Sequence, residues 1–564
     1  MARPRRNSRK TKPAVPAAPL PASRPQPPKA KGGWRETVES CVAVALVYLL
    51  VGFEAQGFVI PTGSMGPTLM GRHKELACPE CGSVFQVNVS EGTEVARGTC
   101  GNCRNDAAIG GLPVFQGDRI GVMKTNVAWP GLFGGPKRWE MIVFRRPEIP
   151  NEPYIKRLVG LSGEQIRIDN GDIYARPLGT SAPFRRPERS TEHRRGMQML
   201  VHDDSHRAKA LRGDPRWDRW TGWSEGPTGL YRPGDAPGWS ELRYRHVVPE
   251  PDQWAAIRVG VDLPHPPRPT LITDFNAYDT DVPAGLELEP RASSKGWLYP
   301  HWVGQLTLAL RLHVEQPRGA VRFELIEGGV PLTCEVDLTS GLATLRRGDE
   351  PLGEPRPTPI RGAGAYDVEF ANVDGRLSLW VDGEAPFGDG IEHRGERVGP
   401  TSADLAPVAV ASRGASVRVG GLVLSRDLYY TQFPTRQDDQ ALDRTDPSEL
   451  FDLLADPDRY ASTIKAAATE YDIRPGHSMM LGDNSAWSND GRSWGKIDQI
   501  DPLKPGEGWT STPRASWEVP DNLLIGKVFA VYWPHLRPFG PDLRLSKDVQ
   551  LPARPYFERM KWAH

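Results

Sequence analysis

The sequence of 564 residues predicts a mainly β protein with more than one domain. Most apolar residues fall in short runs that alternate with polar ones and end at Gly, Pro or Asn, which is typical of β-strands. Only one apolar run is long and continuous, and it lies near the N-terminus. A chain of this length exceeds what a single hydrophobic core holds, so two to four domains are expected.

Residues 1–35 form a basic segment. They contain ten Lys or Arg residues, no Asp or Glu, and many Pro and Ala residues, so we predict a disordered tail. Over the whole chain, 70 basic residues balance 70 acidic ones, which does not indicate a nucleic-acid partner. A tail that binds nucleic acid is the alternative, and the segment that follows makes it less favoured.

Residues 36–57 are predicted to form a transmembrane helix. The clean apolar core runs from Cys41 to Phe53, and the stretch from Thr37 to Ile60 is long enough to span a lipid bilayer. The preceding positive charges predict a cytoplasmic N-terminus and an extracytoplasmic chain after Ile60. A cleaved secretory signal is the alternative, but no clear cleavage site with small residues follows, which favours an uncleaved single-pass anchor.

Two separate segments, 58–177 and 476–564, contain short strand-like runs of the same style, and we interpret them as two parts of one domain. The runs are "DRIGVMK", "EMIVFRRP", "EPYIKRLVGL" and "EQIRIDNGDIYA" in the first segment, and "HSMML" and "NLLIGKVFAVYWP" in the second. Residues 431–475 are predicted to be a helical connector. Asp446 is the expected N-cap, with Pro447 at the first helical position and Glu449 in the first turn.

The inserted segment 178–430 is predicted to be a β-sandwich. In "QLTLALRLHV" every second residue is apolar, and Asp374-Gly375 is a hairpin signal between two alternating runs. This stretch is similar to laminin-G and concanavalin-like jelly rolls. Eight of the seventeen tryptophans lie here, which predicts either a carbohydrate or envelope ligand or ordinary core packing. The acidic run "FNAYDTD" is interpreted either as a Ca²⁺ site or as turn residues.

Four of the six cysteines form two CxxC pairs separated by eighteen residues: Cys78, Cys81, Cys100 and Cys103. This spacing falls within the zinc-ribbon range, and four thiolates suit one tetrahedral Zn²⁺. We therefore predict a zinc-ribbon-like insert at 76–106 with a structural zinc. Disulfides are the alternative, because an extracytoplasmic location permits them. No ligand position is left open for a catalytic metal.

Ser64, in "IPTGSMGPTL", is a candidate nucleophile just after the apolar run. A serine hydroxyl needs a base, yet the chain has no GxSxG elbow and no obvious histidine partner spacing. Lys156 in "YIKRLVG" is the candidate base. On a strand it shares a face with Tyr154 and Leu158, and apolar neighbours would favour its neutral form. A lysine that points to solvent is the simpler alternative.

The motifs "IPTGSMGPTL", "GDRIGVMK", "EMIVFRRP", "YIKRLVGLSGEQI" and "LGDNSAWSNDGRSWG" occur in the order found in bacterial type I signal peptidases of the S26 type, which this chain resembles over about 58–176 and 476–536. The resemblance implies that Ser64 is the nucleophile and Lys156 the general base. It further implies that Thr62 and the Ser64 N–H form the oxyanion hole, that Ser488 orients the lysine, and that Asp490 and Arg492 support it. The positions matching shallow substrate pockets are Phe58, Ile60, Met65, Leu69, Tyr154 and Ile155.

The sequence departs from the family pattern at two supporting positions, Gly491 and Ser485, and neither belongs to the dyad. The resemblance implies a serine endopeptidase that removes signal peptides from exported preproteins at a bacterial inner or plasma membrane, with no catalytic cofactor. Two alternatives stay open. One is a cell-envelope binding protein in which the peptidase fold is a scaffold, and the other is a related Ser/Lys protease that acts on another membrane substrate.

Overall fold

The computed structural model describes residues 34–128, 130–146, 149–235, 237–285, 301–393, 395, 399–432, 447–464, 468–494, 517–533, 536–537, 554–555 and 560–562. Residues 1–33 of the predicted tail, and Asp446, lie outside these ranges. The chain divides into two compact units, 1–53 and 54–564. Helix α1 (Trp34–Glu54) forms where the apolar run predicts a helix. Within the described ranges, no helix combines the length and the apolar character that crossing a membrane requires.

An eight-stranded antiparallel sheet joins the two segments that we interpret as one domain. Its order is β1 (Ala55–Val59), β6 (Arg119–Met123), β30 (Leu524–Trp533), β7 (Met141–Arg146), β8 (Ile149–Gly160), β28 (His477–Leu481) and β29 (Glu518–Pro520), with β33 (Lys561–Trp562) also paired to β30. Strand β30 from the C-terminal segment lies between β6 and β7, and β28 pairs with β8. Segments separated by about three hundred residues of sequence therefore form one sheet.

A three-stranded sheet extends this part of the fold: β10 (Asp172–Pro177), β9 (Glu164–Asp169) and β27 (Thr469–Asp472). The β9–β10 turn is Asn170-Gly171, and both residues have positive φ angles, 48° and 84°, as a tight hairpin turn demands. Within the predicted helical connector 431–475, α8 (Pro447–Ala455) begins at Pro447 as predicted and is followed by α9 (Pro457–Thr463). The same segment also contains strand β27, which pairs with β9.

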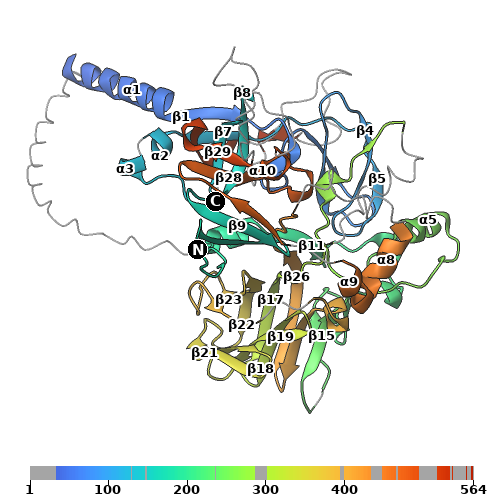
Figure 1. Ribbon diagram of the computed structural model, residues 1–564. Helices are drawn as coiled ribbons and strands as arrows, with labels where there is room; N and C mark the ends of the chain where they lie inside the picture. The colour runs from blue at the N-terminus through green and yellow to red at the C-terminus, as the bar shows by residue number, and fades with distance from the viewer. Residues whose placement is uncertain are drawn as a thin grey trace, which may run out of the picture. The chain divides into compact units, whose positions relative to one another are not determined.

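The inserted segment contains two antiparallel sheets (Figure 1). The two sheets share one apolar core. One sheet contains β13 (Ser224–Glu225), β14 (Tyr231–Arg232), β26 (Ser416–Arg426), β17 (Leu306–Gln316), β22 (Gly364–Val373), β23 (Arg376–Val381) and β24 (Ile391–Glu392), with β11 (Met199–Asp203) beside β26. The other contains β12 (Trp220–Thr221), β15 (Ser240–Tyr244), β25 (Val408–Arg413), β18 (Ala320–Glu327), β19 (Val330–Asp337), β20 (Leu342–Arg347) and β21 (Glu350–Pro357).

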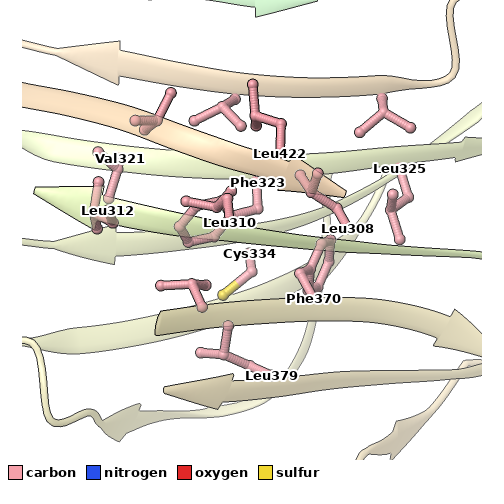
Figure 2. Packing of buried hydrophobic residues seen from close by; sticks show 14 of the residues in the cluster. Leu308, Leu310, Leu312, Val321, Phe323, Leu325, Cys334, Phe370, Leu379 and Leu422 are labelled. Atoms are coloured by element: carbon pink, nitrogen blue, oxygen red, sulfur yellow. The ribbon is translucent and has the colours of Figure 1, made fainter. Parts of the chain in front are cut away.

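The predicted alternation of β17 explains this packing. Leu308, Leu310 and Leu312 are buried in the core shared by the two sheets, and Figure 2 shows them near Phe323 of β18 and Phe370 of β22. Burial of such side chains is the main source of stability for a two-sheet arrangement. The Asp374-Gly375 turn has positive φ angles, 58° and 67°, as its hairpin signal predicts.

The cysteine segment forms two hairpins: β2 (His73–Ala77) with β3 (Val84–Asn88), and β4 (Val95–Thr99) with β5 (Asp106–Ala108). The inserted segment adds strand β16 (Val282–Pro283) to β4 and packs α5 (Pro251–Val259) onto the cysteines through Trp254. The Trp254 indole donates to the carbonyl of Cys103 at 3.1 Å. The two cysteine hairpins, which we call the cysteine module, therefore share one apolar core with the inserted segment.

The other α-helices in the described part of the chain are short: α2 (Thr125–Ala128), α3 (Pro130–Phe133), α4 (Thr191–Gly196) and α10 (Gly491–Trp494). The single turns η1 (Gly63–Met65), η4 (Ala277–Asp279) and η7 (Ser485–Trp487) lie near the site described next.

Candidate active site

Ser64 lies on the single turn η1, a few residues after the edge strand β1. Met65 and Leu69 have no exposed surface, so this turn is anchored in the core below it. Glycine is required at positions 63 and 66. A Cβ at position 63 would lie 2.5 Å from the Tyr278 ring, and a Cβ at position 66 would lie 2.8 Å from it. Real Cβ atoms do not approach other atoms this closely. The small residues of the motif thus allow a neighbouring ring to pack against the serine turn.

Lys156 lies on β8, and its Nζ is 2.5 Å from the Ser64 Oγ. Its side chain is 2 % exposed, so it does not point to solvent. Burial lowers the pKa of Lys156 from 10.5 to about 8, and the opposing charge of Asp490 only partly offsets this effect. Desolvation penalises the ammonium form, so the amine is poised to accept a proton near neutral pH.

Asp490 and Arg492, the expected supporting residues, form a buried ion pair at 2.6 Å. Asp490 also accepts from the Gly482 N–H at 3.0 Å, which ties the pair to the loop after β28. Arg492 donates to the Ser485 hydroxyl at 2.8 Å and to the Thr431 carbonyl at 2.7 Å. Ser485, one of the two departures from the family pattern, therefore contributes to this network as an acceptor.

Ser488, which the resemblance implies orients Lys156, lies close to the serine turn. The hydroxyl oxygen is buried and has no hydrogen-bond partner among the residues that the structure describes. A Cβ on Gly482 would lie 2.1 Å from the Ser488 Oγ and 2.4 Å from the Ser64 carbonyl oxygen. Glycine at 482 thus keeps Ser488 and the Ser64 backbone in close proximity.

Thr62, the other expected oxyanion donor, precedes the turn with extended backbone angles and makes no capping hydrogen bond with its side chain. It is exposed beside the half-buried Ser64. Its hydroxyl is therefore not used to hold the turn together.

The six residues expected to line the substrate pockets fall into two apolar clusters. Phe58, Ile60, Met65, Leu69 and Ile155 pack into a single apolar cluster, whereas Tyr154 packs with a second cluster around Phe144. Of the six, Phe58 lines a cavity of about 440 Å³ together with Arg145, Pro153 and Asn522.

Sequence reasoning missed a second buried ion pair, Arg157 with Asp483, in which both side chains are fully buried. The guanidinium donates to both carboxylate oxygens, at 2.8 Å and 2.6 Å. This bidentate pair fixes the residue next to Lys156 to the "GDN" loop. The signal was available, because an arginine adjacent to the candidate lysine falls on a strand with apolar neighbours on both sides.

The four CxxC cysteines converge. All four are buried, and their Sγ atoms lie within 4.8 Å of one another. Cys78 and Cys103, and likewise Cys81 and Cys100, are 3.6 Å apart at sulfur, and all four are free thiols. Four thiolates around one Zn²⁺ would be about 3.8 Å apart, given Zn–S distances of about 2.3 Å, whereas a disulfide needs about 2.05 Å. The donor set fits zinc.

A second group, Glu250, Asp252 and His265, also brings three ligand atoms together. Glu250 is already engaged, because it caps α5 and accepts from Arg268 at 3.2 Å. The cluster is accounted for by the start of this helix.

A cavity of about 880 Å³ lies beside Cys103, and its walls come mostly from the Arg-, Trp- and Pro-rich stretch between His202 and Tyr231. Three of the tryptophans considered for carbohydrate binding line it: Trp217, Trp220 and Trp223. Many of its polar side chains are paired with one another, such as Arg207 with Asp204 at 2.6 Å. Carbohydrate binding stays a prediction.

Two comparisons with known proteins match signal peptidases. A family model described as signal peptidase, peptidase S26, matches residues 34–211, which include Ser64 and Lys156. Signal peptidase I of Pseudomonas aeruginosa is 30 % identical over 145 residues, which are 24 % of this chain. The chain spans 38 % of the length of this curated relative. Both similarities support the signal peptidase family for this part of the chain.

Solved structures similar to this chain were also found. The carbohydrate binding module CBM66 from Bacillus subtilis is 9 % identical, with a TM-score of 0.22, and the match covers 37 % of this chain and 96 % of the module. The galectin LEC-6 from Caenorhabditis elegans is 14 % identical, with a TM-score of 0.17, and covers 22 % of this chain and 83 % of the galectin. TM-scores this low support no statement about fold or ligand.

Proposed function

We propose that this protein is a membrane-anchored serine endopeptidase that removes signal peptides from exported preproteins with a Ser64/Lys156 dyad. The observation that carries the proposal is the 2.5 Å contact between the Lys156 amine and the Ser64 hydroxyl, made by a lysine that is almost fully buried. The similarity to signal peptidases supports the substrate class.

The chemistry follows from this contact. The neutral Lys156 amine takes the Ser64 proton as the Oγ attacks the scissile carbonyl, and the resulting ammonium then protonates the leaving amine. The acyl group stays on Ser64 until a water, activated by the same amine, hydrolyses the ester. Negative charge on the carbonyl oxygen is stabilised by the Ser64 N–H and the Thr62 hydroxyl. No cofactor enters these steps.

An in vitro cleavage assay on a precursor protein tests the proposal. We expect Ser64→Ala and Lys156→Met to lose cleavage while remaining folded, with Ser64→Ala keeping the wild-type melting temperature. Matched controls are Ser478→Ala, a buried serine on β28 that bonds Asp521, and Lys527→Met, a lysine paired with Glu140. Both controls should cleave normally. Full activity in either dyad variant would reject the mechanism, and cleavage of a different membrane substrate alone would favour the related-protease alternative.

We further propose attachment to a bacterial inner or plasma membrane through the segment around α1, with an extracytoplasmic catalytic domain. Exposed apolar side chains on neighbouring strands support contact with lipid: Val59 on β1, Met123 on β6, Tyr532 on β30 and Trp562 on β33. Such side chains stabilise association with a bilayer surface. Membranes washed with alkaline carbonate should retain the protein, and its release would contradict anchoring.

We also propose that Cys78, Cys81, Cys100 and Cys103 hold a structural zinc, for which the converging free thiols are the support. When bound, the metal would cross-link the two hairpins of the cysteine module. Elemental analysis should find about one zinc per chain, lost in Cys81→Ser and retained in the control Cys334→Ser. Metal-free protein with two disulfides would refute the assignment. The scaffold alternative, in which the sandwich is the working part, is not favoured, because it does not explain a buried lysine in contact with Ser64.

A further inference from the structure

We propose that Asp279 and Asn276, which belong to the inserted segment, are positioning residues for the oxyanion donor of the candidate active site. The inference rests on the proposed function. It assigns a role in catalysis to the "FNAYDTD" loop, which lies outside the five motifs that resemble signal peptidases.

The loop contacts the serine turn directly. Asn276 caps η4 by accepting from the Tyr278 N–H at 3.1 Å. The Tyr278 ring packs against Gly63 and Gly66, and its hydroxyl accepts from the Gly71 N–H at 3.1 Å. The insert therefore covers the turn that carries Ser64.

Asn484, the last residue of "GDN", connects this loop to the serine backbone. Its side-chain Nδ2 donates to the Gly63 carbonyl at 3.1 Å, and its backbone N–H donates to the Ser64 carbonyl at 3.2 Å. The Gly63 carbonyl and the Ser64 N–H belong to one planar trans peptide and point in opposite directions. Holding the Gly63 oxygen therefore fixes the direction of the Ser64 N–H, the expected oxyanion donor.

Asp279 determines how the Asn484 amide is oriented. Its Oδ1 accepts from the Asn484 Nδ2 at 2.6 Å, and its Oδ2 accepts from the Asn276 Nδ2 at 3.0 Å. An ionised carboxylate only accepts hydrogen bonds, so it selects the NH₂ side of the asparagine amide. The Asn276 Nδ2 lies 3.4 Å from the Asn484 Oδ1 and holds the other side. Both Nδ2 hydrogens of Asn484 are thus assigned, one to Asp279 and one to Gly63.

The hydrogen bonds among Asn276, Asp279 and Asn484 are buried. Asn484 is 3 % exposed and Asp279 is 4 % exposed, so water does not readily replace either partner. Asp279 and Asn276 of the acidic run are thus engaged in hydrogen bonds within the chain.

Asp279→Asn tests the proposal, because it keeps the shape of the side chain but removes the acceptor-only carboxylate. Removing an oxyanion donor outright costs about 10²–10³ in kcat, so loosening one should lower kcat about tenfold with KM unchanged. The pH midpoint of activity, set by Lys156, should not move. The matched control is Asp404→Asn, another buried insert carboxylate, whose bonds go to Gly328, Gly329 and Thr401 instead.

A second measurement is independent of catalysis. Hydrogen–deuterium exchange of the peptide containing Gly63–Gly66 should increase in Asp279→Asn and in Asp279→Ala, but not in Asp404→Asn. Unchanged exchange together with unchanged kcat would overturn the positioning role while leaving the Ser64/Lys156 proposal intact. A wild-type protein that fails to cleave precursors would reject the proposed function, and the exchange result would still decide whether Asp279 holds the turn. A fall in melting temperature equal to that of the control, with no change in exchange, would assign Asp279 a purely structural role.

Discussion

The pH dependence of activity and stability should report the burial of Lys156. Its pKa is lowered from 10.5 to about 8. At about pH 7.5, roughly a quarter of such an amine is neutral, against about one part in a thousand for an ordinary lysine. Burial therefore supplies about two hundredfold more of the reactive form of the base. We expect kcat/KM to rise about tenfold per pH unit below about pH 8 and to level off above it.

The assay is steady-state cleavage of a precursor peptide from about pH 6 to about pH 10. Substrate charge is kept constant by choosing a peptide without groups that titrate in this range. A profile that is flat across neutral pH, or one that keeps rising towards 10.5, would refute the reasoning, because the base would then not be a desolvated lysine.

The same shift has a consequence for folding that needs no substrate. The folded pKa lies below the unfolded value, so between about pH 8 and 10.5 the unfolded chain holds a proton that the folded chain lacks. The free energy of unfolding should therefore rise across this window, by about 3 kcal/mol for a shift of this size. Lys156→Met lacks this contribution, so any stability advantage it has over wild type should shrink as the pH rises. Denaturant titrations at the two ends of the window measure the change, and parallel curves for the two proteins would contradict it.

Two further predictions concern the close packing around the dyad. Gly482→Ala should destabilise the fold by about 1–3 kcal/mol and lower kcat, because its Cβ would overlap Ser488 and the Ser64 carbonyl. The control is Gly111→Ala, where a Cβ meets nothing within 4 Å. Equal melting temperatures and activities for the two variants would contradict this account of the packing. Asp483→Ala should destabilise by about 3–5 kcal/mol, because it leaves the Arg157 charge buried and unpaired. Denaturant unfolding should show little or no loss of stability for Arg311→Ala, which removes an exposed ion pair with Asp367, and a similarly small loss for Asp483→Ala would mean that Arg157 is not held by this bond.

Local pattern was enough to predict the strands and the hairpin turns. Alternation in "QLTLALRLHV" predicted which leucines of β17 are buried, and Asp374-Gly375 predicted a turn with positive φ angles, because both depend on neighbours close in sequence. The connector shows where prediction from local pattern fails. Its helix α8 begins at Pro447 as predicted, but β27 gains its strand character only from pairing with β9.

Some residues of the candidate site were identified from the sequence, and others were recognised only in the structure. Resemblance over separated motifs brought Ser64, Lys156, Asp490 and Arg492 to attention, and the structure brings these residues together. Among the described residues, the Ser488 hydroxyl has no hydrogen-bond partner, so its expected role in orienting Lys156 stays a prediction. Asp483 and Asn484 stood inside a quoted motif without an assigned role, because the partners that give them one, Arg157 and Asp279, are hundreds of residues away in sequence.

The sequence by itself determined which residues are able to do chemistry: a serine in a glycine turn, a lysine on an apolar strand, and four cysteines at metal-ligand spacing. These are properties of residue type and local spacing. Only the tertiary structure decided that Lys156 is buried and desolvated, that the four sulfur atoms converge, and that the "FNAYDTD" loop lies against the serine turn. Desolvation and hydrogen bonding depend on every neighbour in space, and most of those neighbours come from distant parts of the chain.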